Sequence, residues 1–388
     1  MKKLIFGLIA ILATQVIQAQ QYYPLAQPCD PDKVFEKLPS AAYDNNCIYK
    51  LHISSQPFNF FPKELFRYPN LKELTLQNTN ISSLPLDIYL LEHIEVLDLS
   101  NNNLTTLPSS IGDMRNLRKL ILRNNKLNTL PATISACKNL QEIDITGNPI
   151  TFLPNEINSL QALRSFRFSG NQVKDPKVLL QLVRQMKNIT SLDLSGCNLN
   201  FIPSDIKFLK NLTELNISNN NIHFLPSEIG QLTHLETLIL GTNGNPGNKI
   251  YDLPTSFSNL RSLKVLSAVN NSFVDFPIAL ASLTGLEVLD LSNNQITSLP
   301  PEIAMMTGLN KLNVMNNQLQ DVPNEIGSLS RLTQFDYAGN QITPEVEQKI
   351  MRIMSGETIA EPVKAVVKKV VVKKVVVKKQ VKKSPKKK

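Results

Sequence analysis

The sequence has few of the residues and none of the short motifs that build common catalytic and metal sites. Four histidines occur in 388 residues, and none lies in an HExxH or comparable ligand spacing. No CxxC pair is present. The GxxxxGK[ST] phosphate loop is missing, although three glycines cluster near residue 244. We therefore expect a protein that is not an enzyme, with no cofactor and no metal site.

Long apolar runs are scarce, and the clearest is at the N-terminus. "MKKLIFGLIAILATQVIQAQ" has two lysines, an apolar run and then Ala19, which predicts a secretory signal peptide over residues 1–19. The run is short for a bilayer span of about 20 residues, and an uncleaved membrane anchor is the alternative. We expect an exported, bacterial protein of the periplasm, the cell surface or the medium. No transmembrane span should remain after signal cleavage.

The sequence repeats itself thirteen times between Ile48 and Leu332. In "IEVLDLSNNNLTTLP", residues 94–108, apolar residues occupy positions 1, 4, 6, 11 and 14, with Asn at position 9 and Pro at position 15. Ten of the twelve steps between copies are 23 residues, one is 26, and the step from Leu235 to Leu263 is 28. A fixed period of this size predicts a solenoid.

Each repeat position has a physical role. Positions 4 and 6 should point inward from a short strand, while positions 3, 5 and 7 point outward. The Asn at position 9 can pair with backbone groups of a buried turn, and the exceptions are Gln56, Thr79 and Cys197. Pro at position 15 fixes φ where the chain enters its convex segment.

The pattern LxxLxLxxNxLxxLP, often followed by xxIGxL, resembles the leucine-rich repeat family, in its 23-residue class of Ras-group and exported bacterial proteins. The resemblance implies an α/β leucine-rich repeat solenoid, a horseshoe with a parallel β-sheet on its concave face. It would hold thirteen units over residues 48–342. The family resemblance also implies mainly protein partners.

Both ends of the solenoid are expected to be capped. Residues 20–47 should form the N-terminal cap, in which Cys29 and Cys47 form a disulfide or remain two free thiols. Cys137 and Cys197 are predicted to be small buried residues that do not meet. Residues 343–356 should form a C-terminal capping helix, with Thr343 as N-cap and a proline at its first position.

The C-terminal tail, residues 357–388, is rich in Lys and Val. Residues 361–388 carry a charge of +11 within a chain of +9, so that the folded body, without the signal peptide, is mildly acidic at −4. The five-residue period gathers no apolar face on a helix or a strand, and we expect disorder. The tail should bind an anionic envelope polymer, lipid or extracellular nucleic acid, or serve only as a solubilising tail. The lysines expected to bind polyanions are Lys368, Lys369, Lys373, Lys374, Lys378 and Lys379.

The outward positions of the later repeats predict a ligand site. Apolar residues there should form a patch on an otherwise polar sheet, beside a Gly- and Asn-rich insertion at 244–249. Tyr251 would add a contact, and Arg123 and Arg167 secondary ones. A tolerated loop and β-branched residues that simply favour strands are the alternative. The predicted patch residues are Ile239, Val265, Val269, Val288 and Met315.

Aspartates recur at outward position 5, which aligns carboxylates that could bind cations or basic groups, although the repeat itself dictates their spacing. Taken together, the sequence predicts an exported, non-catalytic binding protein. Its concave face would recognise a protein or glycan ligand, and its cationic tail would associate with anionic surfaces. The alternative is a structural cell-envelope spacer anchored by the Lys-rich tail.

Overall fold

The computed structural model describes residues 29–355 except 41–42, 177–178, 180–184 and 245–246. The predicted signal peptide and the predicted polyanion-binding lysines of the tail lie outside the described residues. In the described part, no helix is long and apolar enough to cross a membrane.

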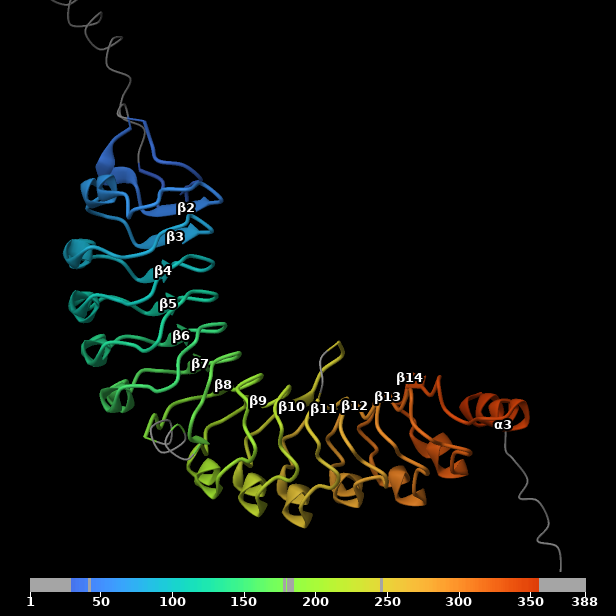
Figure 1. Ribbon diagram of the computed structural model, residues 1–388. Coiled ribbons are helices and arrows are strands. Elements are labelled where there is room, and N and C mark those ends of the chain that lie inside the picture. Colours follow the sequence, from blue (N-terminus) through green and yellow to red (C-terminus); the bar gives the residue numbers. More distant parts are fainter. Residues whose placement is uncertain (1–28, 41–42, 177–178, 180–184, 245–246, 356–388) are drawn as a thin grey trace, which may run out of the picture.

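The described chain forms a curved solenoid with one parallel sheet along its concave side (Figure 1). Fourteen strands follow one another in chain order. Thirteen of them belong to the repeats, and β1 is an added strand from the N-terminal cap. The strands are β1 (Val34–Phe35), β2 (Lys50–Ser54), β3 (Glu73–Gln77), β4 (Val96–Asp98), β5 (Lys119–Ile121), β6 (Glu142–Asp144), β7 (Ser165–Arg167), β8 (Ser191–Asp193), β9 (Glu214–Asn216), β10 (Thr237–Gly241), β11 (Val265–Ala268), β12 (Val288–Asp290), β13 (Lys311–Asn313) and β14 (Gln334–Asp336).

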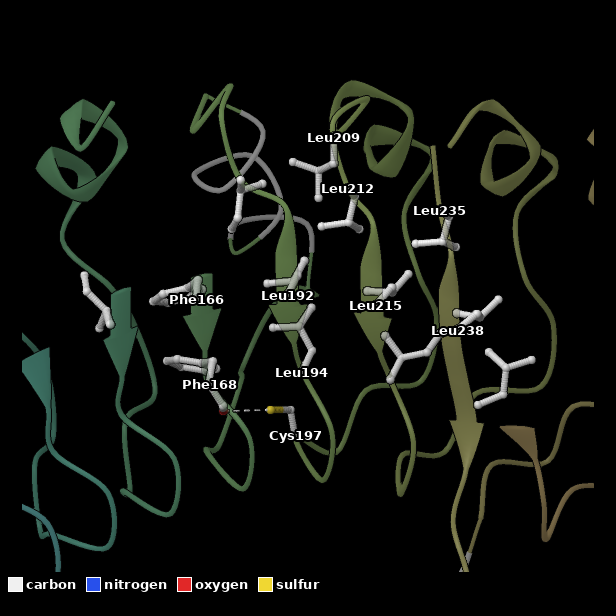
Figure 2. Packing of buried hydrophobic residues seen from close by; sticks show 14 of the residues in the cluster. Phe166, Phe168, Leu192, Leu194, Cys197, Leu209, Leu212, Leu215, Leu235 and Leu238 are labelled. Carbon is white, nitrogen blue, oxygen red and sulfur yellow. Dashed lines mark hydrogen bonds between the residues drawn. The ribbon is translucent and has the colours of Figure 1, made fainter. Parts of the chain in front are cut away.

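The core is a continuous stack of the inward repeat residues. Leu192 and Leu215 are fully buried, and each strand adds residues of the same kind to the next (Figure 2). Phe166 and Phe168 fill two of these positions with stacked rings 5.7 Å apart. Since one unit buries its apolar side only against its neighbours, the stack holds the sheet together.

The convex side carries short 3-10 helices, η2 to η12, that begin directly after the repeat prolines, whereas η1 belongs to the N-terminal cap and follows Asp44. Pro108, for example, is the N-cap of η4 with φ −67°, and its ring fixes this angle before the chain turns. The helices are η1 (Asn45–Cys47), η2 (Lys63–Arg67), η3 (Leu86–Leu90), η4 (Ser109–Asp113), η5 (Ala132–Ala136), η6 (Asn155–Ser159), η7 (Ser204–Phe208), η8 (Ser227–Gln231), η9 (Thr255–Asn259), η10 (Ile278–Ser282), η11 (Pro301–Met305) and η12 (Asn324–Ser328).

A ladder of buried asparagines connects neighbouring units. The Asn125 amide donates to the carbonyls of Leu99 and Leu122, and its oxygen accepts from the N–H of Leu104. Cys197 stands in the same ladder, and its thiol donates to the Phe168 carbonyl at 3.2 Å (Figure 2). A thiol is a weaker donor than an amide and offers fewer bonds, so the ladder is weakened at this unit.

The insertion in the 28-residue step lies earlier than the predicted 244–249. Asn248 is 3% exposed, donates to the Ile217 and Leu240 carbonyls and accepts from the Ile222 N–H, which is the ladder pattern. Asn243, at repeat position 9, instead accepts a hydrogen bond from the side chain of Asn293. The extra residues therefore come before Asn248, because burial of the ladder amide fixes the register on the far side of the loop.

Both caps are built on specific contacts. A disulfide joins Cys29 to Cys47, with their Cα atoms 4.8 Å apart. At the other end, Thr343 is the N-cap of α3 (Pro344–Met354), and its side chain accepts a hydrogen bond from the N–H of Val346. Ile350 and Ile353 of α3 are buried against the last unit.

Candidate functional site

Two rows of outward side chains cross the concave sheet. We call them the first row, which begins at Lys50, and the second row, which begins at His52. The register between parallel strands is continuous, so Lys50 lies beside Glu73 and His52 beside Thr75. The same register runs to Gln334 and Asp336 on β14.

In the N-terminal half of the sheet, β2 to β7, most outward carboxylates are paired with cations. Glu73 lies 3.6 Å from the Lys50 ammonium, and Glu142 accepts ion pairs from Lys119 and Arg167, each at 2.9 Å. Asp98 is held differently, by the Gln77 amide at 2.7 Å. This half of the surface is therefore largely neutralised by internal contacts.

Arg123 and Arg167, predicted as secondary ligand contacts, converge on Asp144. The Arg123 Nε lies 2.6 Å and an Arg167 guanidinium nitrogen 3.6 Å from the same carboxylate oxygen, and the Asp144 side chain is 0% exposed. The arginine side chains keep 46% and 37% of their surface. Both arginine side chains remain partly exposed to solvent, but their charges stabilise the buried carboxylate of Asp144.

In the C-terminal half, β8 to β14, the carboxylates of the two rows have a different environment. Within the described ranges, none of them lies within 4.0 Å of a Lys, Arg or His nitrogen. Ser191 donates to Glu214, and Ser292 and Asn313 donate to Asp290. These contacts leave the carboxylates without a direct ion pair, and the cation nearest to Asp290 in the two rows is Lys311, diagonally across on β13. The residues are Asp193, Glu214, Asp290 and Asp336.

Three predicted patch residues lie together between two of these carboxylates. Val265 on β11 is paired directly with Val288 on β12. Ile239 on β10 is opposite Ser267, two residues from Val265, and so lies diagonally beside it. All three side chains are half-buried. We call Ile239, Val265 and Val288 the apolar strip. Glu214 on β9 lies before the strip, Asp290 lies two residues after Val288 on β12, and Lys311 on β13 is the lateral neighbour of Val288.

The other two predicted patch residues do not belong to this strip. Val269 is 1% exposed, so its prediction as an outward contact is wrong. β11 ends at Ala268, and the alternation of faces stops with the strand, since the chain then turns inward toward the buried Asn271. Met315 also follows the end of its strand, β13, and is half-buried away from the row that contains Val288.

The insertion reaches across its neighbouring unit. Asn270 donates to the Thr242 carbonyl at 2.9 Å, and Asn293, two units along, donates to Asn243 at 3.3 Å. Tyr251 is 60% exposed and follows this loop. The described part of the insertion therefore lies along the strand ends of β10 to β12, at the edge of the apolar strip.

Sequence reasoning missed two features of this face. Val96 and Ile121 are further outward, half-buried apolar residues on β4 and β5, and they lie among paired charges. Position 8 of the repeat adopts positive φ, as at Asn101 (φ 57°) and Asn124 (φ 51°), which accounts for its Asn and Gly. In the sequence, the recurrence of Asn or Gly at position 8 indicates this backbone conformation.

The remaining candidate groups are possible metal ligands and the two free cysteines. Among the described residues, no group of three His, Cys, Asp or Glu side chains could hold a metal ion. Cys137 and Cys197 are free and buried. Burial raises the pKa of the Cys137 thiol to about 11 and that of Cys197 to about 12, which keeps both protonated.

Comparison with known proteins agrees with this architecture. A family model described as "Leucine-rich repeat region" matches residues 55–198 and 177–293, and one described as "Leucine Rich repeats (2 copies)" matches 284–326. No curated protein matches the chain.

Several solved structures are similar over most of this chain. A leucine-rich repeat protein of Leptospira interrogans is 30% identical with a TM-score of 0.68, covering 81% of this chain and 84% of that one. An internalin of Listeria monocytogenes is 22% identical with a TM-score of 0.66, covering 81% and 86%, and shares the fold. A plant peptide hormone receptor in complex with RGF2 is 26% identical with a TM-score of 0.59, covering 76% and 48%. The repeats, the continuous parallel sheet and these matches show that the chain belongs to the leucine-rich repeat family.

Proposed function

We propose that this chain is an exported, non-catalytic binding protein that recognises a protein ligand on the C-terminal half of its concave face. The observation that carries the proposal is the apolar strip, which lies on the open sheet beside Glu214 and Asp290, two carboxylates that form no direct ion pair with a described residue. Apolar surface at the centre and charge at the rim is the usual arrangement of a protein interface.

The charges indicate the kind of ligand. A partner that covers the strip must also approach carboxylates that form no direct ion pair with any described cation. Basic side chains beside aliphatic or aromatic ones meet both requirements, because each buried uncompensated charge would oppose binding. A polypeptide satisfies this more readily than a neutral glycan does. The plant receptor among the similar structures was solved with RGF2 bound, which supports a polypeptide ligand.

Export and the role of the tail are further parts of the proposal. The N-terminal sequence has the features of a signal peptide, and a disulfide in the cap suits an oxidising compartment. The Lys-rich tail would associate with anionic lipid, envelope polymer or nucleic acid. If the tail alone carries the function, the protein is instead an envelope spacer.

The test is capture of proteins from a surface extract of the source organism by the immobilised full chain. Val288→Lys removes apolar surface and adds a repelling charge, so it should reduce capture at least tenfold, the effect of losing about 1.5–3 kcal/mol of apolar contact. Val274→Lys is the matched control, because Val274 is 48% exposed and lies outside the sheet.

Mass spectrometry should identify the same protein with the wild-type chain and the Val274→Lys control. Equal capture by both variants would place the binding site elsewhere. A chain that ends at Glu361 distinguishes the binding protein from the envelope spacer. A spacer loses its envelope association on truncation and shows no ligand whose capture depends on Val288.

A further inference from the structure

The chain itself contains a segment with the chemistry that the apolar strip requires. Residues 366–379 read VVKKVVVKKVVVKK, in which aliphatic groups alternate with paired lysines. This segment lies in the part of the sequence that carries +11, whereas the folded body carries −4. The two parts of the chain are therefore opposite in charge, and each offers aliphatic side chains.

The spacing of the segment fits the surface. Three inter-strand steps separate Glu214 on β9 from Asp290 on β12, or about 14 Å. In an extended chain, five residues from one lysine pair to the next cover about 16 Å. One Val triplet laid across the strands, residues 370–372, would thus cover the apolar strip. One lysine pair would then lie beside Glu214. The other would reach Asp290 on β12, with the like charge of Lys311 on the next strand.

The attachment point allows the same molecule to supply the segment. The described chain ends directly after α3, whose 11 residues span about 16 Å. Four inter-strand steps from β14 to β10 add about 19 Å. The fourteen residues 356–369 can extend over about 46 Å, so the segment reaches the strip without strain. Tethering also gives the segment an effective concentration in the millimolar range.

We propose that the Val-Lys segment 366–379 docks in cis on the apolar strip, with its lysines beside Glu214 and Asp290. The inference rests on the proposed function, because it uses the same surface. Docking makes the tail a competitor of the ligand. A polyanion that binds the lysines removes the tail and opens the strip, so that ligand capture becomes linked to contact with an anionic surface.

The experiment measures tryptic cleavage of the tail in the full chain, since every contact lysine is a cleavage site. Cleavage follows the population of the undocked tail. At low salt, cleavage between Lys368 and Lys379 should be about fivefold slower than in a free synthetic peptide of residues 361–388, equivalent to about 1 kcal/mol from two exposed charge clusters. No heparin is added, because a polyanion would bind the lysines of the tail. Light scattering verifies that the protein is a monomer.

Two pairs of variants identify the docking surface. Glu214→Gln with Asp290→Asn removes both charges and should raise the cleavage rate to that of the free peptide. Asn at the Asp290 position is compatible with the fold, because Asn216 and Asn313 occupy it on β9 and β13. Asp113→Asn with Glu302→Gln makes the same charge change on exposed residues of η4 and η11 and should leave protection intact.

Equal cleavage of the full chain and the free peptide would refute docking. Protection that increases with protein concentration would assign the surface to the tail of a second copy and refute the cis arrangement. Neither result affects the proposed ligand site, which depends on the separate comparison of Val288→Lys with Val274→Lys.

Discussion

Removing Arg123 and Arg167 together should destabilise the solenoid far more than the two single changes suggest. Both guanidinium groups compensate Asp144, whose side chain is 0% exposed. After Arg123→Ala, Arg167 remains 3.6 Å from the carboxylate. After Arg167→Ala, the Arg123 contact at 2.6 Å remains. Each single change should therefore cost only about 1 kcal/mol, because the arginines are part-exposed.

The double variant leaves a buried carboxylate without a cation. Among the described contacts, Asp144 then keeps the Thr146 N–H, 3.1 Å from its oxygen. An uncompensated buried charge costs about 3–5 kcal/mol, so the coupling between the two arginines should be about 1–3 kcal/mol. Adding Asp144→Asn should restore most of the lost stability, because Asn stands at the equivalent position on β9 and β13.

The assay is thermal unfolding followed by circular dichroism, with hydrogen exchange of the β6 amides as a local readout. The local measurement is needed because repeat arrays do not always unfold in a single transition. If the free-energy loss in the double variant equals the sum of the singles within about 0.5 kcal/mol, the two arginines act independently. Failure of Asp144→Asn to rescue would also refute the reasoning.

The cysteines provide two further tests. Alkylation of the denatured, unreduced protein should modify two thiols, and reduction of Cys29–Cys47 should lower the free energy of unfolding by about 2–4 kcal/mol; four modified thiols before reduction would contradict the bridge. Burial raises the folded-state pKa of Cys137 to about 11 and of Cys197 to about 12, from 9.0. The contribution of these two thiols to the free energy of unfolding is full below pH 9. It is lost as pH rises toward these values, because the thiols of the unfolded chain ionise first. Unfolding measured against pH should show a smaller alkaline loss in a Cys137→Ala, Cys197→Ala variant.

The sequence determined the architecture. The 23-residue period, the inward apolar positions and the repeat prolines each recur in nearly every unit. An irregular residue in one unit therefore does not obscure the pattern, because the neighbouring units repeat it. The C-terminal helix was equally predictable from the sequence, because Thr343 and the proline after it act only on the first turn of the helix. These features depend on contacts that are local or that repeat at a fixed distance along the chain.

The tertiary structure decided what the outward residues do. Val269 looked like a strand residue facing solvent, but the end of β11 turned it inward. Asn243 looked like a ladder residue, yet Asn248 took that place, because the buried position goes to whichever amide best satisfies the backbone of two units. The contrast between paired Glu142 and uncompensated Glu214 depends on side chains of neighbouring units. Directly paired residues of neighbouring repeat strands lie at least 23 residues apart in sequence, so only the folded sheet brings such charges together or keeps them apart.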